Sequence, residues 1–145
     1  MFKWGGVRSG VQGGGGGSVG RGQKGGTKAA GDAAEARALA LLLDAGLSLL
    51  RRNYRVARGP GARGGEVDLI LRERDGTLVF VEVRARSGDG HGGAAASVRA
   101  VKQRRIVFAA QYFLLDWPQP PPCRFDVVAI DGDAIEWLRG AFEAG

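Results

Sequence analysis

Two alternating runs of apolar and polar residues, joined by a short turn, occupy the middle of the chain between Gly65 and Arg86. The runs extend from Glu66 to Glu73 and from Thr77 to Ala85, with Asp75-Gly76 between them. Alternation on both sides of an Asp-Gly pair is typical of a β-hairpin. The length of the loop constrains everything else, because it decides which side chains share a face.

The loop can be built in two ways. With a two-residue turn at Asp75-Gly76, the side chains of Asp68 and Glu82 point to opposite faces of the hairpin. With a three-residue loop, in which Gly76 adopts the left-handed conformation, Asp68 faces Glu82.

The apolar pattern favours the three-residue loop, which pairs Glu73 with Thr77. It gathers six apolar residues on one face, which we expect to be core: Val67, Leu69, Leu71, Val79, Val81 and Val83. The other face is apolar in its middle and charged at the end away from the turn. Glu66, Asp68, Glu82 and Arg84 lie at that charged end.

Asp68 opposite Glu82 is unfavourable for a sheet. Directly opposed residues have Cβ atoms roughly 4.5 to 5.5 Å apart, and like charges at that separation repel each other. A bound cation, a shared proton, or Arg84 on the same face as Glu82 would compensate. Alternatively, these charged residues have no catalytic function and form a surface ion-pair network in which Glu66 and Arg84 are cross-strand partners. Such networks stabilise proteins little.

Carboxylates from neighbouring strands, with a basic residue two positions after the second acid, are the groups that metal-assisted phosphodiester hydrolysis needs. Carboxylate oxygens bind Mg²⁺ and leave it several water positions, and the metal polarises the phosphate and generates hydroxide. The basic group offsets the negative charge that develops on the phosphate.

This arrangement resembles the PD-(D/E)xK nuclease superfamily, with Val67-Asp68 in place of Pro-Asp and Glu82-Val83-Arg84 in place of (D/E)xK. More narrowly, the strings GEVDLI, FVEVR and CRFDVV resemble the YraN family of small, uncharacterised bacterial proteins related to Holliday-junction resolvases. The resemblance covers the chain from about Gly31 to Phe142.

The resemblance implies an α/β, restriction-endonuclease-like domain with a mixed β-sheet flanked by helices. It also implies a Mg²⁺- or Mn²⁺-dependent endonuclease that hydrolyses DNA, including branched DNA, while RNA stays an open alternative. Asp68 and Glu82 would bind the metal, Glu35 from the first helix would assist, and Arg84 would stabilise the phosphate. Cleavage of a junction would require two active sites and hence a homodimer.

Two positions depart from the superfamily pattern. Val67 stands at the loosely kept proline position, and Arg84 stands where a lysine is expected. A guanidinium does not lose its proton, so it cannot act as a base, although it can bind phosphate bidentately. Lys102 is the candidate that supplies the missing ammonium group. The rival hypothesis is a nucleic-acid-binding protein that keeps the fold and does not cleave.

The charge of the chain is divided unevenly along its length. The net charge is +6, but residues 1–30 contain five of the 21 Lys and Arg and none of the 15 acids. We interpret residues 1–30 as a flexible, Gly-rich basic tail and residues 31–145 as one domain. We expect no secretory signal and no membrane span, because no apolar run is long enough.

Two basic runs without acids flank the hairpin, at residues 51–63 and 99–105. Basic segments on both sides of an acidic site suit a polyanion held on both sides of the bond to be cut, and each run alone is also explained as a solvated face. The nucleic-acid-binding residues that we expect are Arg55, Arg58, Arg63, Arg99, Lys102 and Arg105.

The remaining elements follow from composition and capping signals. We predict a helix after Asp32 that ends before Gly46, a strand over 47–56, and a long helix capped by Ser97 that reaches about Asp116. Strands over 123–130 and 134–138 complete the order.

Four further side chains, two of which form a pair, have two interpretations each. Glu35 is either a metal ligand or, with Asp32, part of a capping box. Tyr54 either packs in the core or stacks on a base. Arg124 and Asp126 form an ion pair more readily than a catalytic pair. The single cysteine excludes an internal disulfide and a cysteine-based zinc site, which is consistent with a cytoplasmic protein.

Overall fold

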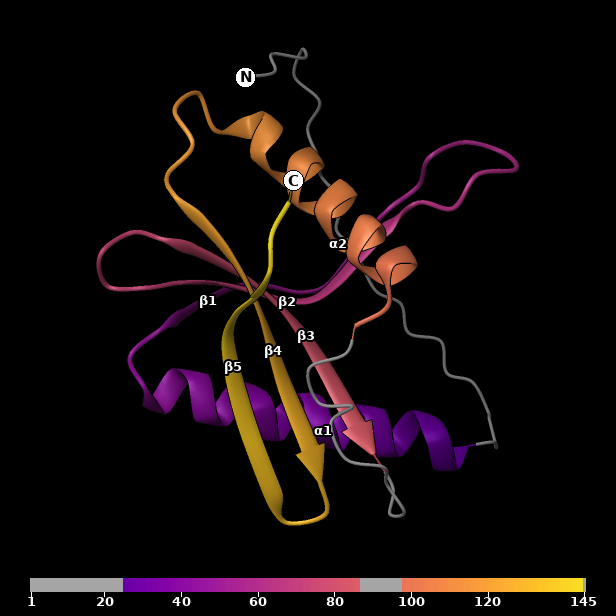
Figure 1. Cartoon of the computed structure of the whole chain (residues 1–145), viewed down its shortest axis with the longest axis vertical. Helices are drawn as coiled ribbons and strands as arrows, with labels where there is room; N and C mark the ends of the chain where they lie inside the picture. Colours follow the sequence, from indigo (N-terminus) through magenta and orange to yellow (C-terminus); the bar gives the residue numbers. More distant parts are fainter. Residues whose placement is uncertain (1–24, 87–97, 145) are drawn as a thin grey trace.

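The computed structural model describes residues 25–86 and 98–144 (Figure 1). The elements are α1 (Gly25–Asp44), β1 (Ser48–Val56), β2 (Gly65–Arg72), β3 (Leu78–Arg86), α2 (Ala100–Phe113), β4 (Cys123–Asp131) and β5 (Ala134–Phe142), with a short 3-10 turn at Leu114–Asp116. This order confirms the predicted succession of one helix, three strands, one helix and two strands. Neither α-helix among the described residues is both long and apolar enough to cross a membrane.

The strands form one mixed sheet in the order β1-β2-β3-β4-β5. Among the described residues, only β3 and β4 pair in parallel, and α2 makes the crossover that a parallel pair requires. The mixed sheet with flanking helices confirms the predicted α/β class and is compatible with a restriction-endonuclease-like fold.

The β2–β3 hairpin has the predicted three-residue loop. Leu69 pairs with Val81 and Arg72 pairs with Leu78, and the Glu73 N–H donates to the Thr77 carbonyl at 2.8 Å. Gly76 has φ +97°, the left-handed conformation that the loop needs. The register that places Asp68 and Glu82 at the same level is therefore confirmed.

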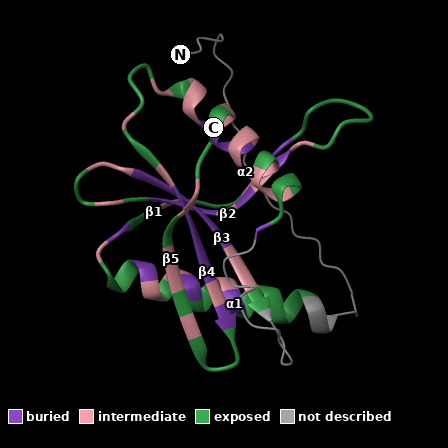
Figure 2. Ribbon diagram, in the orientation of Figure 1, coloured by how far each residue is buried: buried purple, intermediate pink, exposed green. Residues whose placement is uncertain are grey.

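Each face of the sheet is covered by one helix (Figures 1 and 2). On the α1 side, Ala38 and Leu42 pack with Leu69, Leu71, Val79 and Val81. On the α2 side, Ile106 and Ala110 pack with Ile70, Phe80 and Val127. The predicted core face was wrong for Val67, which packs on the α2 side because β2 has already left β3 at this point.

The sheet opens like a fork between β2 and β3. Their pairing ends at Leu69–Val81. Beyond that pair, β2 stays paired with β1 as far as Gly65, whereas β3 stays paired with β4 as far as Arg86. Asp68 and Glu82 are the first residues past the last pair, one on each branch. We call this opening the fork.

The start of α1 differs from the prediction. The helix begins at Gly25, so the end of the predicted tail is helical, while residues 1–24 lie outside the described part of the chain. Asp32 and Glu35 lie inside the helix, and the predicted capping box is wrong. Lys28 and Asp32 form an i,i+4 ion pair at 3.7 Å, which, together with the run of alanines, favours the longer helix.

Two other helix and strand ends need correction. The N-cap position of α2 is Arg99, which makes no side-chain capping bond, while the predicted cap Ser97 lies outside the described residues. Strand β5 continues to Phe142 because the buried carboxylate of Asp126 accepts hydrogen bonds from Trp137 and from the Gly140 backbone N–H.

The structural interpretations of Tyr54 and of the Arg124–Asp126 pair are confirmed. Two guanidinium nitrogens of Arg124 donate to the two carboxylate oxygens of Asp126, both at 2.9 Å. The ring of Tyr54 packs edge-on against Phe113 with centroids 5.5 Å apart.

Gly65 sets the distance between β2 and α2. A Cβ atom added here would lie 2.7 Å from the backbone nitrogen of Ala109 and 2.7 Å from the backbone oxygen of Arg105. The backbones are therefore in direct contact, and α2 is held against the end of β2 where the fork opens.

We predict that Gly65→Ala destabilises the protein by about 1–3 kcal/mol, because the added methyl group forces two backbone segments apart. Chemical denaturation measures the change. Gly31→Ala is the matched control, since Gly31 lies inside α1 with open space around it and alanine is the better helix former. Equal stability of the Gly65 variant and wild type would contradict the close packing of α2 on β2.

Candidate functional site

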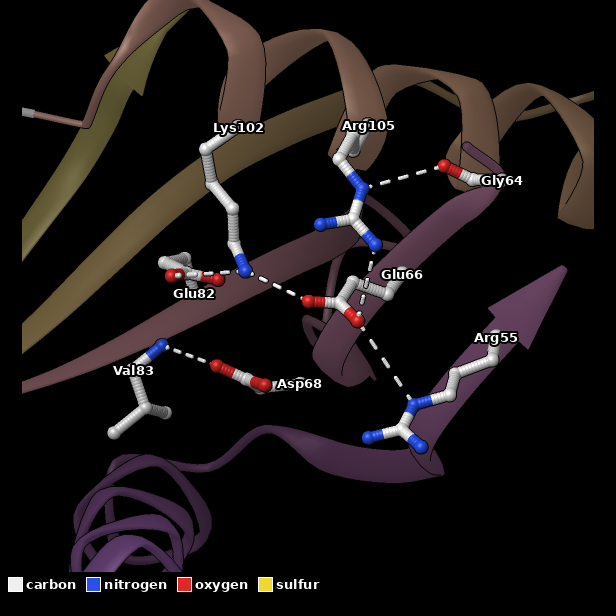
Figure 3. Close-up of polar contacts among 8 residues, drawn as sticks. All are labelled: Arg55, Gly64, Glu66, Asp68, Glu82, Val83, Lys102 and Arg105. Atoms are coloured by element: carbon white, nitrogen blue, oxygen red, sulfur yellow. Dashed lines mark hydrogen bonds and ion pairs between the residues drawn. The ribbon is translucent and has the colours of Figure 1, made fainter. Parts of the chain in front are cut away.

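The charged side chains gather at the fork, between the first turns of α2 and the middle of α1 (Figure 3). Asp68 comes from β2 and Glu82 from β3. Lys102 and Arg105 reach toward them from α2, and Arg55 approaches from β1. The site thus draws on four elements that are distant in sequence.

Asp68 and Glu82 are the most deeply placed acids of the site. Oδ2 of Asp68 accepts a hydrogen bond from the backbone N–H of Val83 at 2.8 Å, which ties the two branches of the fork together. The Glu82 side chain is only 10 % exposed, and its Oε1 is buried without a hydrogen-bond partner. An orphaned buried oxygen is rare in folded proteins and calls for a proton or a cation.

The environment of this acid pair favours protonation. Burial raises the pKa of Glu82, the charge of Asp68 raises it further, and the result is a pKa of about 8. Burial likewise raises the pKa of Asp68. The two carboxyl groups affect each other's pKa, so in the absence of a cation the pair favours holding a proton. The groups around the acid pair therefore do not fully offset the repulsion between its two carboxylates.

Lys102 supplies positive charge beside the acid pair. Its Nζ donates to Oε2 of Glu66 at 2.7 Å and lies 3.8 Å from Oε2 of Glu82. Burial lowers the pKa of Lys102, but the hydrogen bond to Glu66 and the charges of Glu82, Glu66 and Asp68 outweigh burial and raise it overall. Lys102 therefore stays protonated at neutral pH and acts as a cation, not as a base.

Glu66 is the residue whose position the sequence did not reveal. We expected it to pair with Arg84 across the hairpin, but the β2–β3 pairing ends before this level. Instead, Glu66 contacts Lys102, Arg105 at 3.5 Å and Arg55 at 3.9 Å. The hydrogen bond from Lys102 lowers the pKa of Glu66 despite burial, so this carboxylate is ionised. The opening of the sheet has no sequence signature, which is why these partners were missed.

Glu35 approaches the acid pair from α1. Burial raises its pKa, and the charge of Asp68 raises it further, which shows that the two carboxyl groups interact. The charge of Arg52 and a hydrogen bond from the Asn53 side chain oppose this shift. Oε1 of Glu35 is buried without a hydrogen-bond partner, as is Oε1 of Glu82.

The donor atoms fit a hard divalent cation bound mainly by two carboxylates. Within residues 25–86 and 98–144, no group of three or more His, Cys, Asp or Glu side chains is close enough to form a complete ligand set. Mg²⁺ does not need one, because it commonly takes one or two protein carboxylates and keeps several water ligands. The orphaned Oε1 of Glu82 is an atom that a cation bound by the Asp68–Glu82 pair would satisfy.

The other predicted residues are placed as follows. Arg84 is half-buried on β3, two residues past Glu82 and on the same side of the strand. Arg99 and Arg63 are exposed, at the start of α2 and in the β1–β2 loop. Arg58 stacks over the ring of Phe108 at 4.6 Å. Of the predicted nucleic-acid-binding residues, Arg55, Lys102 and Arg105 make contacts with Glu66 at the fork.

Comparisons with known proteins place the chain among relatives of similar length. Residues 34–130 match the model of a family described as uncharacterised protein family UPF0102. A UPF0102 protein of Methylibium petroleiphilum is 67% identical over 118 residues, covering 81% of this chain and 97% of the relative. One of Paracidovorax citrulli is 66% identical over 119 residues, covering 82% and 86%. These names state no activity, so function must be argued from the site.

The raised pKa of Glu82 predicts how stability depends on pH in metal-free buffer. The unfolded chain releases the Glu82 proton near pH 4.5, whereas the folded protein keeps it up to about pH 8. The stability that the bound proton confers is present below the unfolded pKa. This stabilisation, on the order of 2 kcal/mol for the Asp68–Glu82 pair, is lost as pH rises toward 8.

Thermal unfolding of wild type and Glu82→Gln across this pH range checks the prediction. The glutamine variant keeps a neutral side chain at every pH, so its melting temperature should fall less between pH 5 and 8. Glu136→Gln, at an exposed position of β5, controls for the loss of a surface charge. Parallel curves for wild type and Glu82→Gln would show that Glu82 is ordinarily ionised.

Proposed function

The chain belongs to the UPF0102 family, and we propose that this member is a metal-dependent nuclease, related to the PD-(D/E)xK nucleases, that hydrolyses phosphodiester bonds in DNA, including branched, Holliday-junction-like DNA. The observation that carries the proposal is the placement of Asp68 and Glu82. Both lie at the fork, with an orphaned buried oxygen on Glu82 and the Lys102 ammonium 3.8 Å from that carboxylate.

Stability alone does not account for this arrangement. Burying two acids side by side raises the pKa of both and makes the ionised state unfavourable. Apolar residues at the fork would pack on α1 and α2 without that penalty. Carboxyl groups with strongly shifted pKa values, grouped beside a cation, are characteristic of catalytic sites.

Each residue has a distinct role in the proposed reaction. Asp68 and Glu82 would hold Mg²⁺ or Mn²⁺, and Glu35 would assist metal binding from α1. When bound, the metal would supply positive charge that polarises the phosphate and lowers the pKa of water. Lys102, which stays protonated, would stabilise the negative charge that develops on the phosphate oxygens, and Arg84 would bind the same group bidentately.

The overall reaction is hydrolysis at one phosphodiester. The oxygen of a water molecule forms a bond to phosphorus and the bond to one bridging oxygen breaks. One product strand ends in a phosphate and the other in a hydroxyl group, which takes up a proton. Arg55 and Arg105 at the fork, with Arg58, Arg63 and Arg99 farther out, would bind the backbone on either side.

A non-catalytic nucleic-acid-binding protein is the second candidate, favoured by Arg84 at the lysine position. The carboxylates argue against it, because acids weaken a surface that serves only to bind phosphate. RNA is the alternative polyanion, and a junction substrate would require a homodimer with two active sites.

The test of the proposal is cleavage of labelled linear and four-way-junction DNA with Mg²⁺, with Mn²⁺ and with chelator. We predict metal-dependent cleavage by wild type and a loss of about 10²-fold or more in Asp68→Asn and Glu82→Gln, because each variant removes a metal ligand's charge. Glu136→Gln is the control, with unchanged activity expected. DNA binding without metal-dependent cleavage would favour the non-catalytic candidate.

The same assay assigns the ammonium group. Lys102→Gln should reduce the cleavage rate about 10²-fold, whereas Arg84→Lys should keep it within a few fold, since Lys102 already provides the charge. A larger loss of cleavage rate in Arg84→Lys than in Lys102→Gln would show that the essential cation is Arg84.

A further inference from the structure

A single carboxylate at the fork is shared by three cationic side chains from two elements (Figure 3). Glu66 receives a hydrogen bond from Lys102 at 2.7 Å through Oε2. Its other oxygen, Oε1, lies 3.5 Å from Nη2 of Arg105 and 3.9 Å from Nε of Arg55. The four side chains, which we call the Glu66 cluster, carry a net charge of +2.

The cluster is not an efficient way to stabilise the fold. Arg55 is 72 % exposed, and ion pairs at such positions stabilise little. Three cations that converge on one acid repel one another, so one acid and one cation would be more stable. The net positive charge that remains is suited to an anion from outside the protein.

The position of Lys102 depends on Glu66. The first turn of α2 has no acidic residue, and Arg99 makes no capping bond. Cations in the first turn of a helix are opposed by its dipole. Glu66, placed on β2, provides the negative charge that holds the Lys102 ammonium at the fork, where it also lies 3.8 Å from Glu82.

The two arginines keep donors available for an anion. Their contacts with Oε1 of Glu66 are long, and a guanidinium has five N–H donors. Nε of Arg105 also donates to the Gly64 carbonyl at 3.4 Å, which fixes the orientation of its plane. A guanidinium of fixed orientation, such as that of Arg105, is well suited to bind phosphate.

We propose that Glu66 is a positioning residue, which holds the Lys102 ammonium beside the Asp68–Glu82 pair, and that Arg55 and Arg105 beside it form a subsite for the phosphate group adjacent to the one that is cut. The identity of the ligand, a nucleic-acid backbone, rests on the proposed function. The arrangement of the cluster does not.

This role predicts opposite effects on binding and on cleavage. Glu66→Gln removes the only negative charge of the cluster, so metal-free affinity for DNA at low salt should rise about threefold to tenfold. The same change frees Lys102, so the single-turnover cleavage rate should fall about 10- to 100-fold. Glu66→Asp keeps the charge but shortens the side chain, so affinity should stay unchanged while cleavage still falls.

Two measurements on the full chain test the proposal. Fluorescence anisotropy with a short fluorescein-labelled DNA duplex in chelator gives the affinity, and single-turnover cleavage of the same duplex with Mg²⁺ or Mn²⁺ gives the rate. Glu73→Gln is the matched control. Its side chain is 22 % exposed, against 27 % for Glu66, and it pairs with Arg124 at 2.7 Å at the turn end of the hairpin. We expect it to leave the cleavage rate unchanged.

The outcomes are distinct. Tighter binding with slower cleavage in Glu66→Gln, and slower cleavage alone in Glu66→Asp, support the proposal. Wild-type cleavage rates in both variants would overturn the positioning role. If wild type does not cut at all, the proposed function fails, and the subsite is then tested by the affinity measurements alone. In that case Glu66→Gln must bind DNA more tightly than both wild type and Glu73→Gln, and equal affinities would overturn it.

Discussion

The burial of Asp68 and Glu82 side by side is the constraint on which the rest of the site depends. Two ionised carboxylates at this depth repel each other and lose hydration. Without a cation, the pair is relieved by holding a proton, as the pKa of about 8 for Glu82 shows. Lys102 offsets part of the charge from 3.8 Å away. A divalent cation would replace this proton, so metal binding and proton release are linked in this site.

The fork exists because each branch of the sheet has a partner of its own. Past the Leu69–Val81 pair, β2 is held by β1 and β3 by β4. Gly65 lets α2 lie directly on the backbone of β2, which brings Lys102 and Arg105 to the opening. At the other side of the sheet, the buried Asp126 fastens β5 onto β4. Packing elsewhere in the domain thus maintains an opening that is itself unfavourable.

The sequence predicted local features well. The alternation around Gly76 predicted the hairpin register, because a shift of one residue would have placed the apolar set of one strand on the opposite face from the apolar set of its partner. The pairing of Arg124 with Asp126 followed from the cost of burying an unpaired charge, and the packing of Tyr54 followed from the tendency of aromatic residues in strands to pack in the core. The same register argument predicted that Asp68 and Glu82 lie at the same level of the hairpin.

Features that depend on several elements were not predictable. The partners of Glu66 come from β1 and α2, and no spacing within the chain shows that the sheet opens beside it. Val67 was assigned to the wrong face because strict alternation assumes that β2 and β3 stay paired. The capping role of Glu35 was wrong because the helix begins earlier than predicted, so that Glu35 lies inside it, where the charge of Asp68 raises its pKa.

The most direct test of the central claim, that the acid pair at the fork binds a divalent cation, is a Mn²⁺ titration of ¹⁵N-labelled protein followed by NMR. The account predicts that paramagnetic broadening affects first the backbone amide of Val83, which donates to Asp68, and the amides beside it on β3, and that Mg²⁺ reverses it. In Glu82→Gln this selective broadening should be lost. Broadening that is spread over exposed acids, or that is equal in wild type and Glu82→Gln, would contradict the account.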